Sequence, residues 1–318
     1  MPHPESQSGD SAGPKPRRRG VNVDGMLLLD KPDGMTSNQA LQITKRLLNA
    51  RKAGHTGSLD PIATGLLPLC FGETTRAAGL FLGADKTYRV RIRFGLDTDT
   101  GDREGKALRE SPVAFTEQQL FDALQQFRGR IKQIPPMFSA LKRDGRPLYK
   151  LARKGISVER EAREVTVYNL TVEKWRGDLL DLTLSCSRGF YLRALARDLG
   201  EALGCGAHVS ELRRTAVGDF SVQDAVSVAQ LEALDAPAGR RRLLLPTERA
   251  VAHLPEVGVP DNIAALLCRG RPVRVESAAE DGLVRVSSPG GGFLGLADLA
   301  GGKITPRRLF HRPRPPRR

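Results

Sequence analysis

The 318-residue chain is predicted to fold as an α+β protein. Stretches in which apolar and polar residues alternate, typical of half-buried strands, are interspersed with a few amphipathic helical stretches. The two kinds of segment do not alternate regularly, which favours an α+β domain over a doubly wound parallel sheet. From about Leu254, short strands separated by glycine and proline turns predict a second, small β-rich domain.

Capping residues place two of the predicted helices. One is expected over residues 36–49, with Thr36 or Ser37 as its N-cap. Thr116 and Gln119 have the spacing of a capping box, in which the side chain of each residue bonds a backbone N–H of the other. They predict the start of another helix.

Four further segments have a clear period. Thr87–Leu96 alternates with period two, so one face of this strand is apolar and the other carries arginines. Arg163–Trp175 and Leu179–Ser187 are also predicted to be strands. Tyr191–Leu203 is predicted to be a helix that ends at Gly204.

The charge balance indicates a polyanionic partner. The chain has 50 Lys+Arg against 36 Asp+Glu, a net charge of +14, and cations that neutralise phosphates bind nucleic acids by releasing condensed counterions. Much of the excess is terminal, because residues 301–318 hold seven Lys/Arg and no acid. We predict disordered basic tails over residues 1–20 and 313–318, since neither can bury apolar surface.

Composition also excludes several classes of protein. No apolar run approaches the ~18–20 residues that a membrane-spanning helix needs, and residues 1–20 lack a hydrophobic signal-peptide core. We therefore expect a cytoplasmic protein without a membrane partner. Cysteines and histidines are too dispersed for a zinc site, so we expect no metal and four buried, reduced thiols. The thiols are Cys70, Cys186, Cys205 and Cys268.

The densest group of unusual residues lies over residues 53–65, where Asp60 follows two glycines and precedes Pro61. Glycine permits backbone angles closed to other residues, and a proline biases the residue before it away from helical geometry. Asp60 is therefore expected in a shaped loop. A local alternative makes Asp60 only the N-cap of a helix whose first position is Pro61.

This loop resembles the signature of the TruB family, the bacterial tRNA pseudouridine synthases that modify the T-loop uridine at tRNA position 55. Other blocks that resemble the family follow in the family's order from about residue 25 to residue 310. These blocks are Leu29-Asp30-Lys31-Pro32 with Gly34 and Thr36-Ser37, Lys86-Thr87-Tyr88-Arg89-Val90, Pro135-Pro136 with Ser139-Ala140-Leu141-Lys142, Cys186 to Arg193, Gly204 to Val209, and Leu212-Arg213-Arg214.

The resemblance implies a fold and a reaction. The fold would be a large mixed, mainly antiparallel sheet flanked by helices, with a small β-rich, PUA-like C-terminal domain. The reaction would detach uracil from its ribose and rejoin it through carbon, after the base is flipped out of the folded T-loop. It implies no cofactor. The implied partner is the T-arm of tRNA, with no obligate protein partner and a monomeric enzyme.

The resemblance also implies three catalytic residues. Asp60 matches the required aspartate, since a carboxylate can act on sugar or base while it stays ionised. Tyr88 matches the tyrosine that faces the target base and is implicated in proton removal, although its strand position alone predicts a core residue. Arg193 matches the arginine that pairs with the aspartate, although by itself it would be expected on a solvated helix face.

Four residues are implied in substrate binding. Tyr88, Tyr191 and Leu212 match residues that contact the target uridine, and His55 matches the histidine that holds the T-loop with its uridine flipped out. Taken locally, His55 would only bond within its own loop and Leu212 would be ordinary core. Phe190 stands where the family commonly has threonine.

The implied domains are a catalytic domain over residues 21–250 and a PUA-like domain over residues 251–312. Within the first, residues 135–164 resemble the family's mobile, RNA-gripping insertion. Its basic residues, which a local view would assign to a solvated face, are Lys142, Arg143, Arg146, Lys150, Arg153 and Lys154.

Three alternatives stay open. The first is an RNA chaperone that refolds tRNA elbows, an activity compatible with catalysis. The second is a ribosomal or guide-RNA-dependent pseudouridine synthase that shares the core. The third is a nonspecific basic coat, which would show steep salt dependence and no preference for a folded T-arm. The resemblance also leaves open whether Asp60 attacks the sugar, attacks the base or removes a sugar proton.

Overall fold

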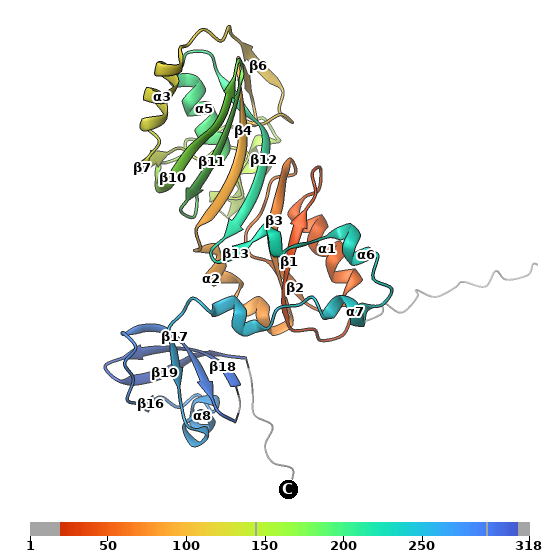
Figure 1. Cartoon of the computed structure of the whole chain (residues 1–318), viewed down its shortest axis with the longest axis vertical. Coiled ribbons are helices and arrows are strands. Elements are labelled where there is room, and N and C mark those ends of the chain that lie inside the picture. Colours follow the sequence, from red (N-terminus) through yellow and green to blue (C-terminus); the bar gives the residue numbers. More distant parts are fainter. Residues whose placement is uncertain (1–19, 144, 291, 311–318) are drawn as a thin grey trace, which may run out of the picture.

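A computed structural model describes residues 20–143, 145–290 and 292–310, so the predicted basic tails, apart from Gly20, lie outside the described residues. It contains a large sheet flanked by helices and a separate small β-rich unit at one end of the molecule (Figure 1). The predicted α+β fold is confirmed.

The large sheet has ten strands and is mixed but mainly antiparallel, because only the β1–β14 and β12–β3 pairs run parallel. Along its main path the order is β14 (Val226–Ser227), β1 (Gly25–Lys31), β3 (Ala63–Phe71), β12 (Ala207–Val217), β4 (Lys86–Phe94), β11 (Leu179–Cys186), β10 (Arg163–Arg176) and β7 (Gly129–Gln133). Two short strands pair off this path, β2 (Ala53–His55) with β3 and β13 (Phe220–Ser221) with β12.

The predicted strand at residues 87–96 is β4, in the middle of this sheet. Its apolar side chains are buried on the face covered by α5, and Arg89 and Arg93 are exposed on the other face. The period-two interpretation is confirmed. The strands predicted at residues 163–175 and 179–187 are β10 and β11, which pair with each other.

Both predicted helix starts are confirmed. Thr36 caps α1 (Ser37–Leu47) and Thr116 caps α3 (Glu117–Gln125), each in a complete capping box with the glutamine at N3. The predicted helix at residues 191–203 is α5 (Leu192–Ala202), with Tyr191 as its N-cap residue. The remaining helical segments are η1 (Gly72–Arg76), α2 (Ala78–Leu82), α4 (Leu148–Ala152), η2 (Val222–Asp224), α6 (Val228–Glu232), α7 (Pro237–Arg241) and η3 (Thr247–Val251).

Two small strand pairs complete the part of the chain that precedes the C-terminal unit. They are β5 (Leu96–Thr98) with β6 (Ala107–Glu110), and β8 (Lys142–Arg143) with β9 (Arg146–Pro147). The second pair is a hairpin within the predicted insertion.

The C-terminal unit is a five-stranded sheet packed against one helix. Its order is β15 (Glu256–Gly258), β17 (Gly282–Ser288), β18 (Gly292–Ala300), β19 (Lys303–Leu309) and β16 (Val273–Arg274), and the helix is α8 (Asp261–Cys268). The short strands that the alternation predicts here, Val273–Glu276, Leu283–Val286 and Phe293–Leu296, correspond to β16, β17 and β18, whereas β15, β19 and α8 were not predicted. Its own apolar core forms between sheet and helix. The boundary at residue 250 and the PUA-like character remain predictions.

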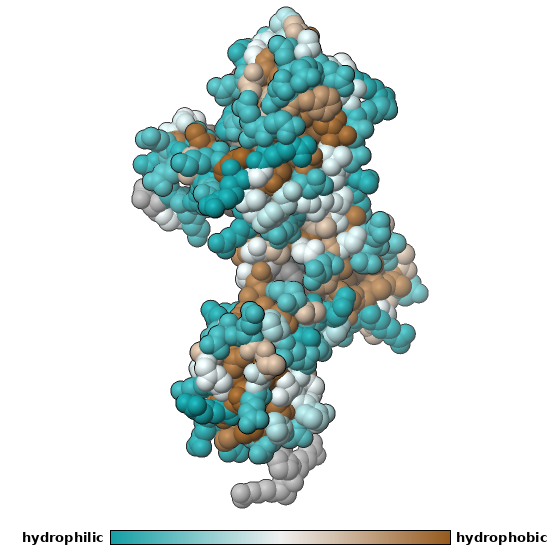
Figure 2. Space-filling model, turned by 60° about the vertical axis from the view of Figure 1, so that its left-hand side comes forward, coloured by the Kyte–Doolittle hydropathy of each residue, from teal (hydrophilic) through white to brown (hydrophobic). Residues whose placement is uncertain are grey.

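An apolar seam joins the two units. Leu296 of β18 is buried in a cluster with Met26, Leu28 and Cys70 of the large sheet. The rings of Phe293 and Phe310 stack beside this cluster, 5.6 Å apart. Burial of this apolar surface stabilises the contact between the two units. Elsewhere, hydrophilic residues cover most of the face seen in Figure 2.

The expectation of four buried thiols is only partly correct. No disulfide joins the four cysteines, which all lie within the described residues, but Cys268 is half-buried while the other three are buried. It ends α8 at the edge of the small unit's core. Within the described residues, no helix is long and apolar enough to cross a membrane.

Candidate active site

Asp60 lies in the loop between β2 and β3, which pair as an antiparallel hairpin. No helix starts at Pro61, because the chain turns and enters β3 at Ala63, whose N–H donates to the Asp60 carbonyl (3.0 Å). The helix-cap alternative is therefore wrong. The Asp60 carboxylate caps no helix and is 39% exposed, so it is available to a bound substrate.

Two buried side chains hold this loop in shape. The Ser37 hydroxyl donates to the Leu59 carbonyl (3.0 Å) and accepts from the Leu59 N–H (2.7 Å). The fully buried Lys31 ammonium donates to the carbonyls of Pro32 (2.8 Å), Met35 (2.5 Å) and Pro61 (3.2 Å). Burial lowers the pKa of Lys31 to about 8. Both residues fix the backbone immediately before and after Asp60.

Arg193 is the direct partner of Asp60. Its Nε lies 2.9 Å from Asp60 Oδ2, while its terminal nitrogens donate to the carbonyls of Thr100 (3.0 Å) and Phe138 (2.7 Å). The residue is only 5% exposed, so the interpretation as a solvated helix face is wrong. A guanidinium with three fixed acceptors holds the carboxylate in one orientation.

A second carboxylate lies behind this pair. Asp102 Oδ2 is 3.7 Å from Arg193 Nε, and Asp102 is buried. Its Oδ1 accepts from the Thr100 hydroxyl (2.6 Å) and the Glu104 N–H (3.1 Å). Gly101 lets the loop that carries Asp102 pass close to Arg193, because its φ is +75° and a Cβ at this position would lie 3.3 Å from the Cβ of Arg193.

These neighbours set the ionisation of Asp60. Burial raises the pKa of the Asp60 carboxyl above its ordinary value, and the charge of Asp102 adds to this rise. Arg193 opposes it strongly and Lys31 more weakly. The arginine is therefore the main influence that favours the ionised carboxylate in a site whose burial favours the neutral acid.

Tyr88 faces the site from β4, beside an arginine of the neighbouring strand. Arg214 lies opposite Tyr88 in the β12–β4 pairing, and its positive charge acts on the Tyr88 phenol. Arg214 is itself buried and donates to the carbonyls of Leu66 (2.7 Å) and Gly57 (3.4 Å). Burial raises the pKa of Tyr88, with Arg214 opposing the rise, so the phenol is neutral near pH 7.

His55 is the last residue of β2, and it lies near enough to Arg214 to be affected by its charge. Burial lowers the pKa of His55, and the Arg214 charge lowers it further, so the imidazole is neutral. Its buried Nδ1 has no hydrogen-bond partner among the described residues. The local alternative, that His55 only bonds within its own loop, therefore finds no support at Nδ1.

Tyr191 and Leu212 approach from two other elements. Tyr191 is half-buried at the start of α5, two residues before Arg193. Leu212 of β12 lies between Ala63 of β3 and Val90 of β4 in the sheet. All six predicted site residues thus lie around the loop that carries Asp60, with Leu212 and Tyr88 on the buried sheet face.

A charged groove is lined by residues of β3, β4, β11 and β12, among them Leu212. It has a volume of about 740 Å³ and is lined by arginines and acids around Thr64. Three of its four arginines are paired, Arg91 with Asp181 (2.7 Å) and Glu211 (2.6 Å), Arg103 with Asp33, and Arg213 with Asp30 (2.7 Å). Because these charges neutralise each other, the groove has no excess of cations to offer a polyanion.

Several site residues escaped prediction. Lys31 and Arg214 lie in blocks that resemble the family, but neither residue was assigned a role from the sequence. For Arg214 a signal was available, because it is a basic residue on the buried face of a strand. Asp102 follows Asp97 and Asp99 in one short stretch. Nothing in that stretch indicates which aspartate is buried.

Comparison with known proteins identifies the family. Residues 45–192 match the N-terminal domain of the TruB family pseudouridylate synthases, residues 193–252 match a tRNA pseudouridylate synthase B C-terminal domain, and residues 255–310 match the C-terminal model of pseudouridine synthase II TruB. The chain is 51% identical over 288 residues to tRNA pseudouridine synthase B of Azoarcus sp. strain BH72, covering 91% of this chain and 95% of the relative. The chain belongs to the TruB family.

A second TruB protein is similar to this chain in sequence over almost its whole length. The tRNA pseudouridine synthase B of Sodalis glossinidius is 49% identical over 308 residues, covering 94% of this chain and 99% of the relative. Membership of the TruB family makes this chain a pseudouridine synthase, an isomerase.

Solved structures support the fold. An archaeal box H/ACA sRNP Nop10–Cbf5 complex contains a chain that matches with a TM-score of 0.68 at 24% identity, covering 91% of this chain and 86% of that one. A Cbf5–Nop10–Gar1 complex matches with a TM-score of 0.69 at 24% identity, covering 94% and 92%. At this identity the likeness shows a shared fold.

Proposed function

We propose that this TruB protein converts the T-loop uridine of tRNA, position 55, to pseudouridine. The observation that carries the proposal is the Asp60 carboxylate, half-exposed in a shaped loop and held by a buried arginine at 2.9 Å. The names of relatives near 50% identity support tRNA as the substrate.

In the proposed mechanism, Asp60 is the catalytic carboxylate that assists exchange of the C–N glycosidic bond for a C–C bond. Arg193 keeps it ionised and oriented. Tyr88 stacks against the target base. Burial raises the pKa of Tyr88, so its phenol is neutral and would first have to lose its own proton to a local base before it could accept the proton from carbon 5. Packing against the base is therefore its larger contribution.

The target base must leave the T-loop stack, which costs a few kcal/mol. We propose that the neutral His55 fills the vacated position, where its unpartnered Nδ1 can accept a hydrogen bond from the RNA. Tyr191 and Leu212 would then bound the pocket of the flipped uridine. No step in this scheme requires a metal or an organic cofactor.

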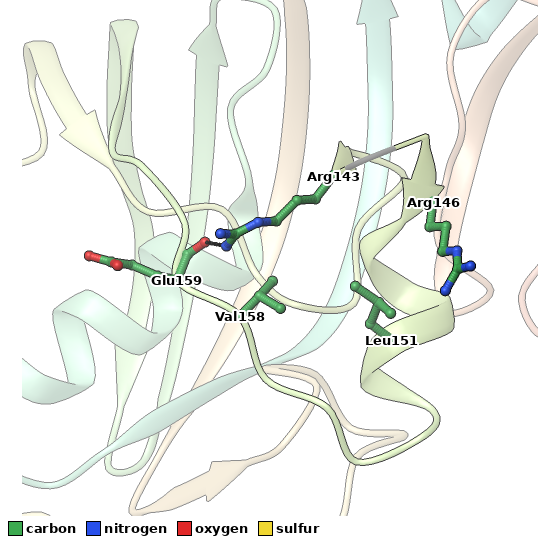
Figure 3. Close-up of a pocket in the computed structure, with 5 residues that line it drawn as sticks. All are labelled: Arg143, Arg146, Leu151, Val158 and Glu159. Atoms are coloured by element: carbon green, nitrogen blue, oxygen red, sulfur yellow. Dashed lines mark hydrogen bonds between the residues drawn. The ribbon is translucent and has the colours of Figure 1, made fainter.

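The insertion is proposed to grip the RNA backbone. Its cations Lys142, Arg143, Arg146, Lys150 and Lys154 form no ion pair within the described part of the chain. In Figure 3, Arg143 reaches across a pocket to the backbone carbonyl of Glu159 (2.9 Å), whose carboxylate points away. Unpaired cations can exchange their counterions for phosphates, unlike the paired arginines of the groove on the sheet.

The Arg143→Ala, Arg146→Ala double variant is therefore expected to weaken tRNA binding in a salt-dependent way. Each lost phosphate contact should reduce the slope of log K against log[salt] by about 0.7–0.9. The matched control is Arg93→Ala, which removes an exposed arginine already paired with Asp178. Filter binding across a salt series measures both. Equal slopes for the double variant and wild type would contradict the proposed grip.

Pseudouridine mapping tests the function directly. Purified protein incubated with unmodified tRNA and no added cofactor is expected to convert the T-loop uridine alone. An isolated T-arm hairpin should also be a substrate, whereas ribosomal fragments should not. An unchanged T-loop uridine would overturn the assignment, and conversion of ribosomal RNA only would favour the rival synthase class.

A chaperone activity would be separable from this chemistry. If an Asp60→Asn variant still accelerates tRNA refolding but forms no pseudouridine, the wild-type protein has both functions and they are separable. The refolding assay therefore belongs beside the mapping experiment.

A further inference from the structure

Gln133 is a buried side-chain amide at the junction between the large sheet and the insertion. It is the last residue of β7, and it is 2% exposed. An amide buried in this way is costly unless its donor and acceptor both find partners. Neither composition nor periodicity singles this residue out.

Both polar atoms of Gln133 bond the same residue, Tyr191. Its Oε1 accepts from the Tyr191 N–H (2.8 Å) and its Nε2 donates to the Tyr191 carbonyl (3.1 Å). Tyr191 is the N-cap residue of α5, and its own side chain makes no capping bond. The amide thus fixes the backbone at the start of the helix that carries Arg193 on its first turn.

The chain that follows Gln133 is tied to the same helix. Arg197 donates to the Ile134 carbonyl (3.2 Å) and Arg193 donates to the Phe138 carbonyl (2.7 Å). The root of the insertion, residues 133–138, therefore lies along the first turns of α5. Arg193 donates to this root through a terminal nitrogen and contacts Asp60 through its Nε.

We propose that Gln133 is a positioning residue for pseudouridine formation. By holding the Tyr191 backbone it sets Arg193 against Asp60, and it links that pair to the insertion that receives the RNA. The inference rests on the proposed function of this site and names one more residue that the reaction needs. Gln133 itself touches no reacting atom.

Only glutamine satisfies both bonds at this position. Asparagine is one methylene too short to span the same gap. Glutamate keeps the acceptor for the Tyr191 N–H but lacks the donor, and it sets a carboxylate against the Tyr191 carbonyl. Methionine has nearly the same length and volume without either polar function, so it isolates the hydrogen bonds from packing.

The experiment compares Gln133→Met and Gln133→Glu with wild type in the full-length protein. Single-turnover pseudouridine formation on saturating tRNA is expected to fall about 10- to 100-fold in Gln133→Met, because a small misplacement of a catalytic group costs this much. The Kd for tRNA should stay within about threefold. The acid limb of the pH–rate profile should move to higher pH, because Arg193 then opposes the raised pKa of Asp60 less well.

Gln125→Met is the matched control, because it makes the same change at an exposed position of α3. Circular dichroism and the Tm establish which variants fold, and Gln133→Glu is the second test if Gln133→Met does not. A folded Gln133 variant with the wild-type rate and acid limb would overturn the inference. A loss confined to tRNA affinity would also overturn it. Absence of T-loop modification by wild type would instead refute the proposed function.

Discussion

Asp60→Asn is expected to abolish pseudouridine formation while the protein keeps its fold and its affinity for tRNA. The amide has the same shape as the carboxylate but has neither its charge nor its basicity, so any route that needs a carboxylate is blocked. We expect a loss of at least about 10³-fold in the single-turnover rate. Mapping pseudouridine in tRNA at enzyme excess measures the residual rate.

Stability should change little in Asp60→Asn. Its side chain is partly exposed, it caps no helix, and the backbone bond from Ala63 to the Asp60 carbonyl does not depend on the side chain. Arg193 keeps Asp102 as a neighbouring anion at 3.7 Å. Asp178→Asn, at an exposed ion pair remote from the loop, is the matched control and should retain full activity. A residual rate within tenfold of wild type would remove Asp60 from the mechanism.

Arg193→Met is expected to damage both stability and catalysis. It leaves Asp102 buried without its cation and removes the donors to the Thr100 and Phe138 carbonyls. Removing one partner of a buried ion pair costs about 3–5 kcal/mol in the free energy of unfolding. Activity should fall by at least about 10²-fold, since the Asp60 carboxylate is then free to rotate and easier to protonate.

The pH dependence gives this prediction its sign. Burial already raises the pKa of Asp60 and Arg193 opposes that rise, so its removal raises the pKa further. If ionised Asp60 is the active form, the acid limb of the pH–rate profile moves to higher pH in Arg193→Met. Arg193→Lys keeps a charge but loses the planar guanidinium, so its acid limb should lie between those of wild type and Arg193→Met. An acid limb at the wild-type pH in Arg193→Met would contradict the proposed role of Arg193.

Denaturant unfolding separates the two effects of Arg193. In Arg193→Lys the ammonium can still neutralise Asp102, so most of the lost stability should return while part of the rate stays lost. Full recovery of the rate by lysine would show that only charge, and not the three fixed acceptors, matters at this position.

Local chemistry determined much of the fold. Capping residues placed the starts of α1 and α3, because an N-cap acts through bonds within its own turn. The period of two in β4 predicted its buried and exposed faces for the same reason, since alternation is a property of the extended backbone. The β-rich C-terminal unit was visible in its turns, but β15 and α8 have weak local signals.

The composition of the candidate site was available from the residues that resemble the TruB family, whereas its geometry was not. Asp60 follows β2, Arg193 opens α5 and Tyr88 lies in β4, and these elements are far apart in the chain. Their meeting depends on the parallel β12–β3 pair and the antiparallel β12–β4 pair. A register of this kind is set by burial across the whole sheet.

What the sequence by itself determined is therefore the class of fold, the local elements and the residue types around one aspartate. Only the tertiary structure decided that Arg193 is buried rather than solvated, that Asp102 shares it, and that Gln133 holds its helix. The physical reason is that a charge or an amide becomes costly, and so demands a specific partner, only once folding has removed it from water.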